Sequence, residues 1–107
     1  MIYNSPFKAK EYSSEIVKKF QDKGVVVFGT GNFGSLINSA LKQKNIAVNY
    51  FVDNNFNNWG KKFEGVETIS AKDIVKKNKD SYILIASLNF RYLKRQLKDL
   101  GIKNFYD

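Results

Sequence analysis

The stretch VVVFGTGNFGSLI, residues 25–37, decides the fold of this chain. Its first four residues are apolar and rich in β-branched side chains, which is typical of a strand buried on both faces of a parallel sheet. After the glycines, Phe33, Leu36 and Ile37 share one face of a helix. The stretch therefore predicts a strand, a tight glycine turn and an amphipathic helix, in that order.

The turn has the spacing G-x-G-x-x-G. Its members are Gly29, Thr30, Gly31, Asn32, Phe33 and Gly34. In nucleotide-binding βαβ units the first glycine permits the turn, the second lets the backbone approach a phosphate, and the third lets the helix pack close to the strand. Free N–H groups at the start of the helix point to the same place. We expect these residues to bind a phosphate; the alternative is a plain strand-to-helix turn.

Strand and helix patterns alternate through the rest of the chain. Helices are predicted over residues 13–23, 32–44, 71–78 and 89–100. Strands are predicted over residues 25–29, 46–53, 66–69, 81–87 and 102–107. The Asn-rich segment 54–65 is predicted to be a loop. The alternation predicts an α/β, Rossmann-like, doubly wound fold, with a mainly parallel sheet of about five strands and helices on both faces. We expect residues 1–10 to form an N-terminal arm and residues 11–107 a single domain.

An acidic residue ends the second predicted strand. Asp53 lies 19 residues after Gly34, where a carboxylate accepts hydrogen bonds from a ribose diol and repels a 2′-phosphate. This position favours NAD or a nucleoside diphosphate over NADP, with Asn54 beside it. The alternative is that Asp53 only caps a turn.

A third polar loop follows the fourth predicted strand. Ser87 and Asn89 offer hydrogen bonds, and the Arg91 guanidinium suits a phosphate or a carboxylate. Alternatively, Asn89 caps the last helix and Arg91 is solvated. Trp59 is expected to pack over the sheet edge rather than stack on a base, and Tyr92 is expected in the core.

Composition limits the chemistry. The 107 residues contain no Cys and no His, which excludes disulfides, thiol nucleophiles and imidazole bases, and we predict no metal site. The net charge is +8, but the lysines are scattered on the polar sides of predicted helices. We therefore expect no nucleic-acid partner, no membrane insertion and a cytoplasmic location, with an anionic small molecule as the ligand.

Four segments together resemble a known type of small Rossmann module: VVVFGTGNFG, YFVDNN, WGKKFEGVETIS and the C-terminal part from residue 81. Similar domains occur in bacterial surface-glycan enzymes, namely at the N-terminus of PglD-type sugar acetyltransferases, CapD-type dehydratases and FkbM-type methyltransferases, and at the C-terminus of sugar C-methyltransferases. The shared pattern covers about residues 24–107. The chain lacks the domains in which the catalytic chemistry of those enzymes lies, so the resemblance implies a binding module.

The resemblance implies that the glycine turn and Asp53 hold the nucleotide part of a sugar nucleotide. The expected cofactor is thus NAD or a nucleoside-diphosphate sugar, and the expected partners are other domains or subunits of an enzyme of cell-surface polysaccharide biosynthesis. Two alternatives stay open: part of an NAD-dependent sugar-nucleotide oxidoreductase, epimerase or dehydratase, and a degenerate Rossmann scaffold that binds no nucleotide. No residue is singled out as catalytic.

Overall fold

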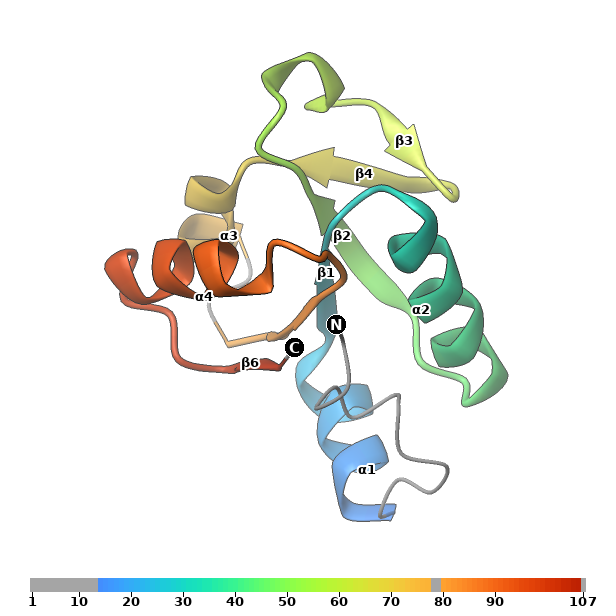
Figure 1. Ribbon diagram of the computed structural model, residues 1–107. Helices are drawn as coiled ribbons and strands as arrows, with labels where there is room; N and C mark the ends of the chain where they lie inside the picture. Colours follow the sequence, from blue (N-terminus) through green and yellow to red (C-terminus); the bar gives the residue numbers. More distant parts are fainter. Residues whose placement is uncertain (1–13, 78–79, 107) are drawn as a thin grey trace.

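The computed structural model describes residues 14–77 and 80–106, in which four α-helices surround one sheet (Figure 1). The N-terminal arm expected over residues 1–10 lies outside the described residues. The helices are α1 (Ser14–Lys23), α2 (Asn32–Gln43), α3 (Ala71–Lys77) and α4 (Phe90–Asp99), with a short 3-10 helix η1 (Phe56–Asn58). The strands are β1 (Val25–Phe28), β2 (Val48–Val52), β3 (Lys62–Phe63), β4 (Val66–Ile69), β5 (Tyr82–Ile85) and β6 (Phe105–Tyr106).

The sheet has the strand order β3-β4-β2-β1-β5-β6. β1 is central and pairs in parallel with both β2 and β5, and β4 and β6 continue the parallel sheet on either side. The chain moves outward from β1 through β2 to β4, and then crosses to the other side of β1 to form β5 and β6. This change of direction puts the topological switch point between β1 and β5, where open α/β sheets bind ligands at the carboxyl ends of their strands.

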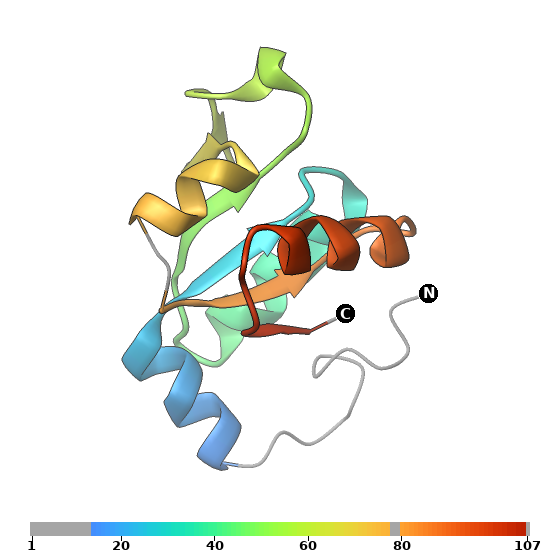
Figure 2. The same cartoon turned by 90° about the vertical axis from the view of Figure 1, so that its left-hand side faces the viewer.

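The sheet is covered on both faces, as the β1 sequence predicts. Val25 and Val27 pack in one core cluster with residues of α1 and α2, whereas Val26 and Phe28 pack in a second cluster with residues of α3 and α4. Figure 2 shows α3 and α4 in front of the sheet, with α2 behind it. All four β1 side chains are therefore buried, and the doubly wound α/β fold is confirmed.

The segment predicted to be a loop, residues 54–65, is partly ordered into η1 and β3. β3 runs antiparallel to β4, and the two strands form a hairpin whose turn residues are Glu64 (φ 51°) and Gly65 (φ 78°). Two successive positive φ angles are the geometry of a type I′ hairpin turn. The sheet thus gains a sixth strand, which the sequence does not indicate because Glu is an unusual residue for the first turn position.

Within the described residues, the helices are too short and too polar to cross a bilayer.

Candidate functional site

A cleft of about 470 Å³ lies at the switch point, beyond the carboxyl ends of β1, β2 and β5. Three loops converge there because the strands that precede them are adjacent and parallel. Backbone hydrogen bonds fix the loops to the neighbouring strand ends, from Gly29 N–H to the Val52 carbonyl and from Ala86 N–H to the Phe28 carbonyl, both at 2.9 Å. The lining residues are Phe28, Gly29, Thr30, Gly31, Asn32, Phe33, Val52, Asp53, Asn54, Ala86, Ser87, Leu88, Asn89, Tyr92 and Leu93.

Two of the three motif glycines are required by the fold itself. Gly29 has φ 136°, and a Cβ atom there would overlap the Ala86 carbonyl oxygen. A Cβ on Gly34 would overlap the carbonyl oxygen of Gly29, so this glycine lets α2 lie against the end of β1. Gly34 is buried and does not line the cleft. Both positions need a glycine whether or not a ligand binds.

Gly31 differs from the other two. It lines the cleft, has an ordinary extended conformation (φ −104°, ψ −156°), and a Cβ there would meet no protein atom within 4 Å. The packing and the backbone therefore both permit a larger residue. A glycine at this position leaves the backbone of the loop open to a molecule in the cleft.

The N-terminus of α2 opens onto the same space. Its N-cap residue is Gly31, which has no side chain to cap the first turn, and no acidic side chain lies in that turn. The first backbone N–H groups of a helix have no intrahelical acceptor, and the helix dipole adds positive potential there. Asn32 and Phe33, in this first turn, line the cleft. This end of α2 can therefore accept an anionic group.

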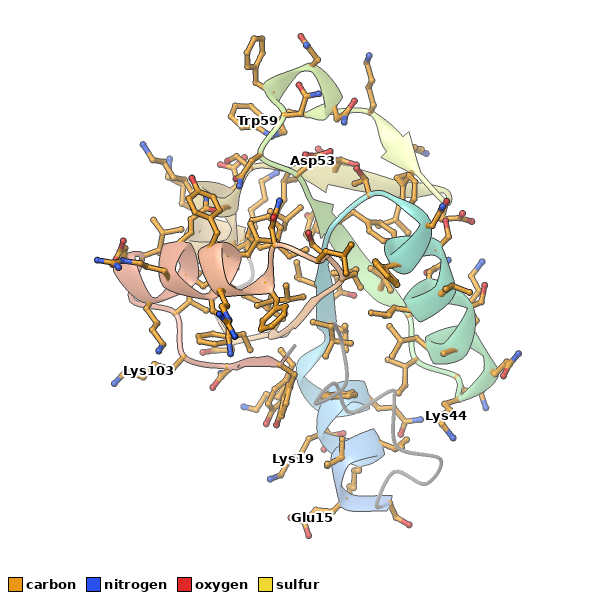
Figure 3. The ribbon with its side chains drawn as sticks, viewed as in Figure 1. Glu15, Lys19, Lys44, Asp53, Trp59 and Lys103 are labelled. Atoms are coloured by element: carbon orange, nitrogen blue, oxygen red, sulfur yellow. The ribbon has the colours of Figure 1, made fainter. Side chains whose placement is uncertain are left out.

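Asp53 follows β2 and carries the one carboxylate among the described residues that line the cleft (Figure 3). Its Oδ2 accepts hydrogen bonds from Thr30 Oγ1 at 2.6 Å and Asn58 Nδ2 at 2.7 Å, and its Oδ1 accepts one from the Asn55 backbone N–H at 2.9 Å. Burial alone would raise the pKa of Asp53, but these hydrogen bonds and one from the Asn54 amide lower it below its ordinary value of 3.8. The group is therefore ionised at neutral pH.

The Asn-rich loop is held beside Asp53 by its own side chains. Trp59 is half exposed, and its indole N–H donates to the Asp53 carbonyl oxygen at 2.6 Å (Figure 3). Asn54 and Gln96 exchange two side-chain hydrogen bonds of 2.9 Å each, which join the end of β2 to α4. Trp59 thus anchors the loop and does not line the cleft, whereas Asn54 does.

Only two of the three site residues predicted in the third loop line the cleft. Ser87 and Asn89 line the cleft, and the Ser87 hydroxyl accepts the backbone N–H of Asn89 at 3.1 Å. Asn89 occupies the N-cap position of α4, but its side chain makes no capping hydrogen bond. Arg91 lies outside the cleft, with its guanidinium 5.9 Å from the centroid of the Phe90 ring.

Tyr92 lines the cleft and was missed at the sequence level. The sequence places it in the core, but 68% of the residue is exposed, because the core-facing positions of α4 are Leu93 and Leu97. The helical spacing of those leucines is the signal that could have excluded Tyr92 from the core. Leu88, also exposed, lies near it at the rim.

The cleft residues suit binding better than catalysis. Among the described residues that line it there is no Lys or Arg, so an anion would be held by backbone N–H groups and the helix dipole. Asp53 is ionised and already accepts several hydrogen bonds, so it is a weak base. In the described parts of the chain, no three His, Cys, Asp or Glu residues gather as metal ligands would.

Solved structures share this fold. The chain is similar to UDP-D-quinovosamine 4-dehydrogenase from Vibrio fischeri, with a TM-score of 0.59 and 19% identity over 74% of this chain and 72% of that one. It is also similar to RSP, a Rex-family repressor, with a TM-score of 0.62 and 22% identity over 84% of this chain. The chain spans less than half of RSP, 46% of its length. At such identities the likeness shows a Rossmann-type fold.

A further structure corrects one expectation. RSP in complex with β-NAD⁺ and operator DNA matches with a TM-score of 0.56 and 23% identity over 83% of this chain and 46% of that one. A protein that contains this fold therefore binds DNA, and the expectation of no nucleic-acid partner is wrong. Scattered lysines do not exclude such a partner, because contacts to the phosphate backbone require only cations within reach.

No curated protein matches the chain in sequence. A family model does match it, over residues 21–105, which is most of the chain and includes all three loops of the cleft. The chain therefore belongs to the family described as C2185-like, N-terminal.

Proposed function

We propose that this domain binds a nucleotide that contains a pyrophosphate, either NAD(H) or a nucleoside-diphosphate sugar, in the cleft at the switch point. The pyrophosphate would lie on the N–H groups of the glycine turn and the start of α2, and the ribose would lie at Asp53. Thr30, Asn32, Phe33, Asn54, Ser87 and Asn89 would complete the site, with Tyr92 at its rim. Arg91 has no place in this arrangement because it lies outside the cleft.

Gly31 is the observation that carries the proposal. The protein's own packing leaves room for a side chain at this position, and its backbone is in a conformation that any residue adopts. A ligand that touches the backbone there accounts for a glycine that the fold does not require. A plain strand-to-helix turn requires Gly29 and Gly34 but not Gly31, where Ser, Asp or Asn would fit and would cap the helix better.

Thermal denaturation with and without ligand tests the proposal. NAD⁺, NADH, NADP⁺, a UDP-sugar and S-adenosylmethionine would each be added at increasing concentration. A true ligand at 100 times its dissociation constant stabilises the folded state by about 2.7 kcal/mol. No shift with any of the five compounds would overturn the proposal and favour a scaffold that binds no nucleotide.

Gly31→Ala makes the test specific to the cleft. We expect the free energy of unfolding of the variant to lie within about 0.5 kcal/mol of the wild-type value, because the added Cβ meets no protein atom. Its nucleotide affinity should fall roughly tenfold or more, because the methyl group separates the phosphate from the backbone N–H groups. Unchanged affinity would remove the glycine turn from the site.

A second candidate is a role in sugar-nucleotide oxidation or reduction, as part of an enzyme of polysaccharide biosynthesis. It is favoured by the likeness to a UDP-sugar dehydrogenase, of which the chain covers 72%. In that case other domains or subunits would supply the catalytic groups that the cleft lacks. Stabilisation by a UDP-sugar but not by NAD⁺ would favour a sugar-binding role, and the reverse result would favour a dinucleotide site.

A further inference from the structure

The Asp53 carboxylate has few acceptor positions left for a ligand. A carboxylate accepts about four hydrogen bonds, two at each oxygen. Thr30 and Asn58 both donate to Oδ2, and Asn55 donates to Oδ1. The folded chain thus fills both acceptor positions of Oδ2 and leaves one on Oδ1.

A ribose that uses Oδ2 must therefore displace one of two side chains. Thr30 lines the cleft beside Asp53, whereas Asn58 does not. The backbone of Asn58 is also fixed, because it lies in η1, where its N–H donates to the Asn55 carbonyl at 3.0 Å and its carbonyl accepts from Lys61 N–H at 3.1 Å. Thr30 is the donor that an incoming molecule can reach.

The Thr30 hydroxyl can also leave without a movement of the backbone. Rotation about χ1 is enough to move Oγ1 away from Asp53, and the backbone of the glycine turn need not move. A ribose hydroxyl would then donate to Oδ2 in its place, so the carboxylate keeps the same number of hydrogen bonds.

We propose that the Thr30 hydroxyl occupies the position of a ribose hydroxyl on Asp53 and is exchanged for it when a nucleotide binds. This inference rests on the proposed function, because it needs a nucleotide in the cleft. Thr30 is then a specificity-determining residue: its hydrogen bond competes with the ribose and lowers the preference of the site for ribonucleotides over deoxynucleotides.

Isothermal titration calorimetry with matched ligands tests this exchange. The probes are ADP and UDP, each compared with its 2′,3′-dideoxy analogue, which lacks the hydroxyl donors. Thr30→Val keeps the shape of the side chain but removes the competing donor. We expect the preference of the variant for ADP or UDP over the matching dideoxy analogue to be roughly tenfold greater than that of the wild type.

Two further variants serve as controls. Thr30→Ser keeps the hydroxyl and should show the wild-type preference for ribose. Thr30→Ala also lacks the donor, and it replaces Thr30→Val if valine impairs folding as judged by the melting curve. A ribose preference that rises in Thr30→Ala and Thr30→Val but not in Thr30→Ser supports the exchange.

The outcomes separate the two proposals. One outcome is that the wild type binds ADP or UDP and that Thr30→Val either changes no affinity or weakens binding of the ribo and dideoxy forms alike. Thr30 then has only a structural role, and the exchange is overturned. The nucleotide site still stands in that case. If the wild type and every variant fail to bind all four probes, the nucleotide site and the exchange are overturned together.

Discussion

Asp53 combines a structural role with its proposed role in binding. Through its two carboxylate oxygens and its carbonyl oxygen it accepts hydrogen bonds from Thr30, Asn55, Asn58 and Trp59. It thereby joins the glycine turn to the Asn-rich loop. Hydrogen bonds to a charged acceptor are stronger than those to a neutral one, so the ionised form of Asp53 holds these segments together best.

Loss of the Asp53 charge should make the protein less stable in acid. Because the pKa of Asp53 is lowered in the folded state, the unfolded chain takes up the proton more readily. The contribution to stability is complete above the ordinary pKa of 3.8 and is lost as the pH falls through the lower folded value. We expect the free energy of unfolding, measured in urea between pH 7 and pH 3, to fall less steeply for Asp53→Asn than for the wild type.

Glu67→Gln is the matched control for this titration. Glu67 is an exposed carboxylate on β4 that does not line the cleft, so its replacement removes one carboxylate and leaves the hydrogen bonds around Asp53 in place. An Asp53→Asn profile as steep as that of the wild type would show that the hydrogen bonds around Asp53 do not contribute to acid sensitivity.

Among the helices and strands, the position of α2 depends directly on a contact with β1. α2 begins at the edge of the cleft, and its third residue, Gly34, packs against the backbone of Gly29 at the end of β1. The position and direction of the helix N-terminus are therefore set by a contact between two glycines.

Gly34→Ala should destabilise the whole domain. The added methyl group would overlap the Gly29 carbonyl oxygen, so the helix must move away from the strand. We expect a loss of about 1–3 kcal/mol in the free energy of unfolding, measured by chemical denaturation. Gly31→Ala, in the same motif, adds the same atoms in open space and provides the control. Equal stability of the two variants would contradict the close packing of α2 on β1.

The sequence predicts the elements well where periodicity is strong. The buried β1 run and three residues of the predicted α2 face, Phe33, Ile37 and Leu41, pack in the core. Leu36, predicted on the same face, is 64% exposed. β3 could not be predicted, because it is two residues long and its turn places Glu64 at a positive φ.

Site residues could be predicted from the sequence only where they directly follow a buried strand, because the end of the strand fixes their position. Asp53 and the glycine turn follow buried strands directly, and the structure brings them together. Arg91 and Tyr92 lie in the first turn of α4, where each residue rotates the side-chain direction by about 100°. The spacing of Leu93 and Leu97 therefore places Tyr92 outside the core, but it does not show whether Arg91 or Tyr92 faces the cleft.

At the scale of the whole molecule, the positively charged side chains do not gather in the cleft. The chain has a net charge of +8, yet no described Lys or Arg lines the cleft. Distant lysines raise the positive potential around the cleft without contacting a ligand. Salt screens this long-range attraction, whereas it weakens hydrogen bonds between the glycine turn and a bound phosphate much less.

Nucleotide affinity should therefore depend moderately on ionic strength. Between about 50 and 200 mM salt we expect the dissociation constant of ADP to rise by a few-fold, as the Debye length falls below about 10 Å. Adenosine lacks the phosphates and should bind weakly and independently of salt. A tenfold or steeper dependence for ADP would indicate direct contacts to lysine or arginine side chains and thus contradict the described cleft.

The hydrogen bond from the Trp59 indole to the Asp53 carbonyl oxygen has a practical consequence. Trp59 is the only tryptophan in the sequence, so the tryptophan fluorescence of the protein comes from this one ring. Its environment is coupled through one hydrogen bond to Asp53, which lines the cleft. Unlabelled protein therefore carries its own fluorescent reporter, positioned so that ligand entry and protonation of Asp53 can each be followed in real time.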